Sequence, residues 1–159
     1  MPHMSYTDNN LVVDEGVIRG VEPLLARIRS LGMLPGLSTH CPETITVSDA
    51  AGYDVETYIQ PLNSIGFLCQ VETDWCANVI RGAKHPCVCI KPLGAGRVMP
   101  PTGLAFAYEN CKPNDTVVIG MLSIQEAEED IEIARACIEQ REAQIALQVT
   151  RSKAALVNE

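Results

Sequence analysis

Residues 87–97, CVCIKPLGAGR, end an apolar run with a lysine and continue into a glycine-rich turn that carries an arginine. Lys91 and Arg97 supply two cations, and Gly94 and Gly96 let the backbone between them approach a ligand closely. A turn of this composition can bind an anionic group such as a phosphate through its amides and its cations. We therefore take these four residues as candidates for binding a small anionic ligand.

Lys91 also has two other interpretations. A lysine that is desolvated in an apolar pocket can form a Schiff base with a carbonyl compound, and the chain would then be a Schiff-base lyase. Alternatively, the aliphatic part of Lys91 lies along a strand and its ammonium group simply reaches water. Anion binding is favoured because Arg97 places a second cation in the same turn.

A second candidate lies at the end of an earlier apolar run, where Ser38 and Thr39 lead into His40. A histidine at a strand end can act as an acid or a base or bind a metal ion. It can also be a neutral side chain that is held by a hydrogen bond and does no chemistry. Partner ligands at metal-binding spacings are missing, so we predict no metal site. His40 and Lys91 are the two candidates for catalysis.

The pattern of apolar residues predicts the elements that position these side chains. A helix over 21–31 precedes four strand–helix units. The predicted strands cover 33–40, 55–63, 86–93 and 115–122, and the helices that follow them cover 43–51, 72–83, 103–111 and 124–148. Ser123 and Glu126 form a capping box at the start of the last helix. Strands rich in valine and isoleucine that alternate with helices are typical of a parallel sheet covered by helices.

The spacing of these units indicates a particular α/β architecture. Successive strands begin 22 to 30 residues apart, and a (βα)₈ barrel uses roughly 30 residues per unit. The chain has half the number of units. We therefore predict a four-stranded parallel (βα)₄ half of a TIM barrel with a long C-terminal helix, over residues 17–150. Residues 1–16 and 151–159 are predicted to be tails.

Alternation along the strands predicts which side chains share a face of the sheet. Ser38 and His40 share one face of the first predicted strand. Cys87, Cys89 and Lys91 likewise share one face of the third predicted strand. We expect these small and polar residues to face the barrel axis. The bulky Val88 and Ile90 would then pack on the covering helices.

Four segments of the chain resemble segments of the aldo-keto reductases. They are GVIRGVEPLLARIRSLGMLPGLSTHCPETI, IQPLN, CIKPLGAGR and VVIGMLSIQEAEEDIEIA. They occur in the order and at the spacing of the last four strand–helix units of that family, and the resemblance covers about residues 17–138.

The resemblance implies a nicotinamide cofactor, NAD or NADP, at the carboxyl ends of the strands. It places Ser38 and Thr39, with Gln60 or Asn63, near the nicotinamide amide. It places the turn from Lys91 to Arg97, with its glycines, near the pyrophosphate, and Ser123 at a helix N-terminus beside the cofactor. The catalytic Asp, Tyr, Lys and His of the family belong to its first four units, with which nothing here aligns.

The start of the last helix departs from the family. Its residues SIQEAEED are acidic where NADP-dependent relatives hold the 2′-phosphate with basic side chains. Carboxylates suit the N-terminus of a helix but repel a phosphate. NADP binding in the manner of the family is therefore not expected. We interpret the acidic run 126–132 as a solvated helix face.

Composition limits the classes of partner. The chain has 20 acidic and 12 basic side chains in 159 residues, a formal charge of −8. This charge disfavours nucleic acid and anionic lipid, and no apolar run is long enough to cross a membrane. The seven cysteines include no CxxC pair, which favours buried thiols in a cytoplasmic protein over a disulfide framework.

Two classes of function remain open, and we do not decide whether the chain is an enzyme. It is a barrel portion that binds a phosphate-bearing ligand or a nicotinamide cofactor, or it is a non-catalytic assembly or ligand-binding module. Half a barrel leaves two strand edges and an apolar inner face uncovered, so we expect a homodimer or a larger homo-oligomer. The candidates for that face are Tyr58 or Ile59 and Val118 or Ile119. The last helix has an apolar stripe at Ala127, Ile131, Ala134, Ile138, Ile145 and Val149, and its residues Ile138, Ile145 and Val149 would instead cap the open face or add to the interface.

Overall fold

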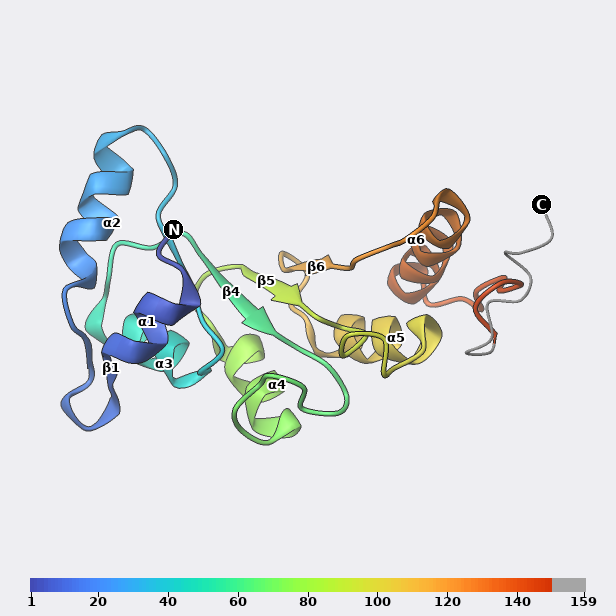
Figure 1. Ribbon diagram of the computed structural model, residues 1–159, viewed down its shortest axis with the longest axis horizontal. Helices are drawn as coiled ribbons and strands as arrows, with labels where there is room; N and C mark the ends of the chain where they lie inside the picture. Colours follow the sequence, from blue (N-terminus) through green and yellow to red (C-terminus); the bar gives the residue numbers. More distant parts are fainter. Residues whose placement is uncertain (150–159) are drawn as a thin grey trace.

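The computed structural model describes residues 1–149, and Figure 1 shows their arrangement. The tail predicted for 151–159 lies outside these residues. The predicted alternation of strands and helices is confirmed. The strands are β3 (Gly36–Ser38), β4 (Thr57–Pro61), β5 (Cys87–Ile90) and β6 (Thr116–Val118), and the helices are α2 (Val21–Ser30), α3 (Glu43–Ala51), α4 (Thr73–Gly82), α5 (Pro100–Asn110) and α6 (Ile124–Glu139). Among the described residues, no helix combines the length and the apolar character that crossing a membrane requires.

The sheet has the order β3-β4-β5-β6, and all of its strands are parallel. Leu37 lies beside Tyr58, Tyr58 beside Cys87, and Cys89 beside Val117. Strands that follow one another in sequence are neighbours in space, with one helix in each connection. The predicted α/β fold with a four-stranded parallel sheet is confirmed, and the arrangement is consistent with half of an eight-stranded barrel.

The helices cover the face of the sheet on which Leu37, Tyr58 and Cys89 lie. Tyr58, the largest fully buried side chain, donates a hydrogen bond to Ser48 of α3 at 3.0 Å. On the opposite face, Ile59, Val88 and Ile90 are partly exposed and Val118 is 46% exposed. The side chains of this second face are aliphatic, so burying it against another surface would be favourable.

The predicted facing of β5 is therefore wrong. Cys87 and Cys89 are fully buried toward the helices, while Val88 and Ile90 lie on the open face. Cysteine behaves as a small buried hydrophobe, and it fits beside the bulky Tyr58 in the layer between sheet and helices. Lys91 does not continue the alternation because its φ of 61° turns the chain out of the strand.

α6 begins as predicted but ends earlier. Ser123 is its N-cap and accepts a hydrogen bond from the backbone N–H of Glu126 at 3.1 Å. The helix stops at Glu139, and Gln140 adopts a left-handed φ of 54°, whereas the sequence predicted a helix to about residue 148. The following residues fold back, since Glu129 accepts hydrogen bonds from three consecutive N–H groups, those of residues 146–148, at 2.6–2.7 Å.

The buried side of α6 also differs from the predicted apolar stripe. Ile131 and Ile138 of that stripe are 55% and 65% exposed, whereas Ile133 and Ala136 are buried. α6 packs on α5 at the end of the molecule remote from α2 (Figure 1). The buried residues share the face that meets α5, so the predicted stripe lay on a different side of the helix.

Residues 1–16, for which the sequence predicted a tail, contain regular structure. α1 (Met4–Asn10) is followed by β1 (Leu11–Val12), a 3₁₀ turn η1 (Val13–Glu15) and β2 (Val17–Ile18), which pairs antiparallel with β1. The N–H of Ser38 donates to the carbonyl of Pro2 at 3.4 Å, so the residues before α1 lie along the outer edge of β3.

Candidate functional site

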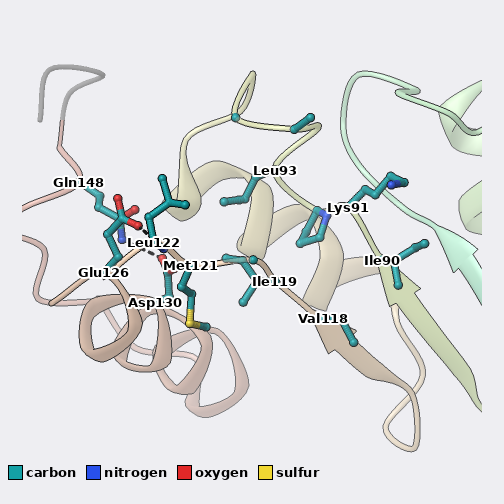
Figure 2. A pocket seen from close by; sticks show the side chains of 14 residues that line it. Ile90, Lys91, Leu93, Val118, Ile119, Met121, Leu122, Glu126, Asp130 and Gln148 are labelled. Atoms are coloured by element: carbon teal, nitrogen blue, oxygen red, sulfur yellow. Dashed lines mark hydrogen bonds between the residues drawn. The ribbon is translucent and has the colours of Figure 1, made fainter. Parts of the chain in front are cut away.

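A cavity of about 580 Å³ lies at the carboxyl ends of β5 and β6. The loop after β5, the segment that joins β6 to α6, and the first turns of α6 form its walls (Figure 2). In parallel α/β folds, ligands bind at this end of the strands. The cavity therefore lies at the end of the sheet that carries the candidate residue Lys91.

Most of the cavity wall is apolar. Its apolar side chains are Ile90, Leu93, Val118, Ile119, Met121 and Leu122. Leu122 is 89% exposed and Met121 is 38% exposed, so part of the wall is open to water. A surface of this kind can receive the apolar part of a ligand.

Lys91 stands at one end of the cavity, on the loop after β5 (Figure 2). Its φ is 61°, and that of Ala95 in the same loop is 57°. A left-handed conformation costs a residue other than glycine about 1 kcal/mol or more. Two such residues in one cavity wall mean that the loop is held in a strained shape, as is common where a loop serves a binding site.

The glycine-rich turn divides into a part that lines the cavity and a part that does not. Gly96 lines it, whereas Gly94 packs against the neighbouring loop, where an added Cβ would lie 2.8 Å from the Cδ1 of Ile65. Arg97 donates to the carbonyl of Gly94 at 2.9 Å, and its guanidinium lies 4.4 Å from the ring centre of Phe67. Among the four predicted residues of the turn, Lys91 and Gly96 therefore face the cavity, and Arg97 holds two loops together.

The other end of the cavity is acidic. Glu126 and Asp130 are 4% and 3% exposed, on adjacent turns of α6. Glu126 accepts a hydrogen bond from the N–H of Leu122 at 2.8 Å, and Asp130 accepts one from the side chain of Gln148 at 2.7 Å (Figure 2). The sequence predicted that the acidic run 126–132 forms a solvated helix face. That prediction is wrong for Glu126 and Asp130, which are buried. Glu126 and Asp130 are four residues apart, and Ile133 follows three residues later. This helical spacing was the signal in the sequence that the three side chains share one buried face.

His40 belongs to a polar cluster at the end of β3. Asp8 of α1 accepts hydrogen bonds from the hydroxyl of Thr39 and from the N–H of His40, the second at 3.0 Å. Burial lowers the pKa of His40, and the charge of Lys91 acts in the same direction against the opposing charge of Asp8. The imidazole is therefore neutral at pH 7. The structure brings His40 and Lys91, the two candidates for catalysis, to the same end of the sheet.

Thr39 and Cys41 in this cluster have structural roles. The hydroxyl of Thr39, which is fully buried, accepts a hydrogen bond from the N–H of Cys41 at 2.9 Å. Burial and the neighbouring carboxylates raise the pKa of Cys41 to about 11, so its thiol stays protonated. Neither side chain is placed to meet a ligand in the cavity.

The remaining candidates for cofactor binding lie apart from the cavity wall. Gln60 is fully buried on the helix-covered face, with its Nε2 3.6 Å from the sulfur of Cys76 on α4. Asn63 is buried and makes two hydrogen bonds, of 2.7 and 2.9 Å, to the backbone of Phe67. Ser123 caps α6, and Ser38 is partly exposed at the end of β3.

Comparison with known proteins gives no match to a family model, to a curated protein or to a solved structure. The resemblance to aldo-keto reductases therefore rests on the four sequence segments alone. What the chain binds must be argued from the cavity and its walls.

Proposed function

We propose that the chain binds a small ligand carrying a phosphate or a similar anionic group, in the cavity at the carboxyl ends of β5 and β6. The observation that supports this most directly is the position of Lys91 on the wall of a cavity of about 580 Å³. Its ammonium would pair with the anionic group of the ligand, and Gly96 allows a close approach of the backbone.

The opposite end of the cavity defines the rest of the ligand. Glu126 and Asp130 repel a second anionic group but can accept hydrogen bonds from hydroxyl or amino groups. The apolar wall between the two ends suits a ring or an alkyl chain. A mononucleotide with one phosphate end and free sugar hydroxyls has this polarity. The nicotinamide cofactors implied by the resemblance carry their phosphates between two nucleosides, so Lys91 would pair with the pyrophosphate and one ribose would lie toward the acidic end. Between them, NAD fits better than NADP, because the 2′-phosphate would meet the acidic end.

The proposal assigns binding and no reaction. Nothing in the chain aligns with the catalytic residues of the aldo-keto reductases, so turnover by that mechanism would need residues from elsewhere. The apolar surroundings of Lys91 also suit a Schiff base. That alternative predicts covalent trapping of an aldehyde at Lys91 by borohydride, and it is distinguished from anion binding in the experiment below.

Calorimetric titration of the full chain with inorganic phosphate, AMP, NADH and NADPH tests the proposal. We expect AMP and NADH to bind, and Lys91→Met to weaken binding by roughly tenfold or more, since a charge-assisted hydrogen bond contributes about 1.5–3 kcal/mol. Lys84→Met is the matched control, because Lys84 is an exposed lysine that precedes the amino end of the same strand.

Three results would contradict anion binding at this site. The first is the absence of heat with every ligand, and the second is equal weakening by Lys84→Met and Lys91→Met. The third is unchanged anion binding in Lys91→Met. Borohydride-stable addition of an aldehyde at Lys91, without anion binding, would support the Schiff-base alternative instead.

A further inference from the structure

A cluster of thiols lies on the helix-covered side of β5, away from the cavity. Cys89 of β5 and Cys111, which follows α5, have their sulfur atoms 3.5 Å apart. Both are free thiols. We propose that Cys89 and Cys111 form a reversible thiol–disulfide pair that is oxidised by hydroperoxides. This inference is independent of the ligand proposed for the cavity.

The two thiols differ in accessibility, which gives them different roles. Cys111 is partly exposed at the end of α5, whereas Cys89 is 1% exposed. The hydrogen bond between the two sulfur atoms lowers the pKa of Cys111, and this effect outweighs burial and the charge of Asp115, which raise it. The same contact and burial raise the pKa of Cys89. Cys111 is therefore the thiol that an oxidant meets first, and Cys89 is positioned to react with it second.

A bound metal ion is the alternative for this cluster. Ligand atoms of Cys89, Cys111 and Asp115 all lie within 4.8 Å of one another, which is three donors of a possible zinc site. However, the ammonium of Lys112 lies 2.9 Å from the carboxylate of Asp115. That carboxylate also accepts backbone N–H bonds from Cys87 at 2.7 Å and from Lys112 at 2.8 Å. A cation already occupies this position, so the arrangement favours thiol chemistry over metal binding.

The proposed oxidation balances with hydrogen peroxide as the co-reactant. The thiolate of Cys111 takes one oxygen atom from the peroxide and becomes a sulfenic acid, and the hydroxide released takes up a proton to give water. The sulfur of Cys89 then attacks the sulfur of Cys111, forms the S–S bond and expels the second oxygen, also as water. Two thiols lose two protons and two electrons, and a dithiol reductant reverses the change.

The disulfide would join the end of β5 to the end of α5. These residues are 22 positions apart, and the loop with Lys91 that forms part of the cavity wall lies between them. Closing a loop of this size reduces the conformational freedom of the unfolded chain. Oxidation should therefore raise the thermal stability of the protein, by roughly 5 °C in Tm or more.

A second pair of thiols serves as an internal comparison. Cys69 and Cys76 also share a hydrogen bond, and both are 0% exposed. Because an oxidant reaches neither sulfur in the folded protein, this pair should stay reduced while Cys89 and Cys111 react. Both pairs have neighbouring sulfur atoms, but only one of them contains an accessible thiol. A difference in their reactivity would therefore be due to accessibility and not to proximity.

The experiment treats the reduced full chain with a small excess of hydrogen peroxide, removes the peroxide, unfolds the protein in urea, blocks the remaining thiols with iodoacetamide and counts them by mass spectrometry. We expect five of the seven cysteines in each chain to be alkylated, with no crosslink between chains. Fragmentation of the digest should assign the crosslink to Cys89 and Cys111. Cys89→Ser and Cys111→Ser should each abolish the intramolecular crosslink. Cys87→Ser, on the same strand and in the same peptide, should leave it unchanged. Dithiothreitol should restore all of the thiols and the original Tm.

Circular dichroism establishes that each variant is folded. If one is not, the rate at which the wild-type Cys111 reacts with N-ethylmaleimide, compared with that of Cys69, tests the accessibility on which the pair depends. A crosslink that involves Cys87 or Cys137, crosslinks only between chains, or a Cys111 that reacts no faster than Cys69 would each overturn the proposal. So would stoichiometric zinc that protects Cys89 and Cys111 from alkylation.

Discussion

At the scale of single residues, the least satisfied group is the Oε1 of Gln60. It is the buried side-chain oxygen without a hydrogen-bond partner among the described residues, although Gln60 is fully buried. A buried polar atom without a partner costs about 1–3 kcal/mol. Gln60→Met keeps the length of the side chain and removes this atom. We expect it to raise the free energy of unfolding by about 1 kcal/mol, measured by urea denaturation.

Asn63 provides the contrasting control, because both ends of its amide are used. Asn63→Leu leaves the N–H and the carbonyl of Phe67 without these partners, and should lower the free energy of unfolding by about 2 kcal/mol or more. A loss of stability in Gln60→Met would show that its Oε1 has a partner, such as an internal water molecule.

His40 should make the stability depend on pH. Its pKa in the folded protein lies below the ordinary value of 6.5, chiefly because of burial. The unfolded chain therefore takes up a proton at this site more readily than the folded protein does. The free energy of unfolding is therefore not reduced by His40 well above pH 6.5, and it declines as the pH falls below that value. In His40→Gln the decline between pH 7 and pH 5, followed by urea denaturation, should be shallower, and an identical slope would contradict the shifted pKa.

At the scale of elements, the end of α6 is set by a conformation that its sequence does not favour. Gln140 has a φ of 54°, a position where helices most often place glycine. Gln140→Gly should raise the free energy of unfolding by about 0.5–1 kcal/mol, because the strain of the left-handed conformation disappears.

A second glycine variant checks that the effect belongs to this position. Gln125 is exposed within the first turn of α6, and Gln125→Gly should lower the free energy of unfolding by up to about 1 kcal/mol. Thermal unfolding followed by circular dichroism measures both variants. If Gln140→Gly proved as destabilising as Gln125→Gly, the helix would continue beyond Glu139.

The elements also show what sequence reasoning could predict here. Alternating apolar runs and helical periodicity predicted the parallel sheet, because each depends on local burial. The facing of β5 was missed, since either face of a strand with cysteine on one side and valine or isoleucine on the other can be buried. The buried carboxylates Glu126 and Asp130 were missed because their burial depends on contacts from outside the helix, such as those with Leu122 and Gln148.

The site was predicted less completely than the fold. Parallel topology predicted the end of the sheet at which the cavity lies, together with Lys91 and Gly96 on its wall. Arg97 and Asn63 were read as ligand-binding because polar residues in a loop look alike in sequence. In the structure Arg97 contacts the ring of Phe67 and the carbonyl of Gly94, and Asn63 donates to the carbonyl of Phe67. Both side chains therefore stabilise loops.

At the scale of the whole molecule, the sheet has one face covered by helices and one face left open. Val118, on the edge strand β6, is 46% exposed on the open face, and Ile131 and Ile138 of α6 are also exposed. Exposed aliphatic faces and free strand edges favour association. We expect a homodimer or a larger homo-oligomer at micromolar concentration, measured by sedimentation equilibrium.

A lysine on the edge strand should oppose this association. Val118→Lys is expected to shift the protein toward the monomer, because charge on an edge strand blocks pairing. Leu34→Lys is the control, since Leu34 is 71% exposed in the turn between α2 and β3. A wild-type monomer at these concentrations, or equal effects of the two variants, would contradict association through β6 and the open face.

The two edges of the sheet are not equivalent, and this limits how copies can combine. The residues around Pro2 lie along β3 and accept the hydrogen bond of Ser38, whereas β6 is at the other edge with Thr116 and Val118 exposed. If both edges were available, β6 of one copy could pair with β3 of the next, and the assembly could grow without limit. With β3 shielded, β6 can pair only with the β6 of a second copy, across a two-fold axis. Growth by strand pairing would then stop at two chains, and we expect the residues around Pro2, which lie along β3, to separate a finite assembly from a fibre.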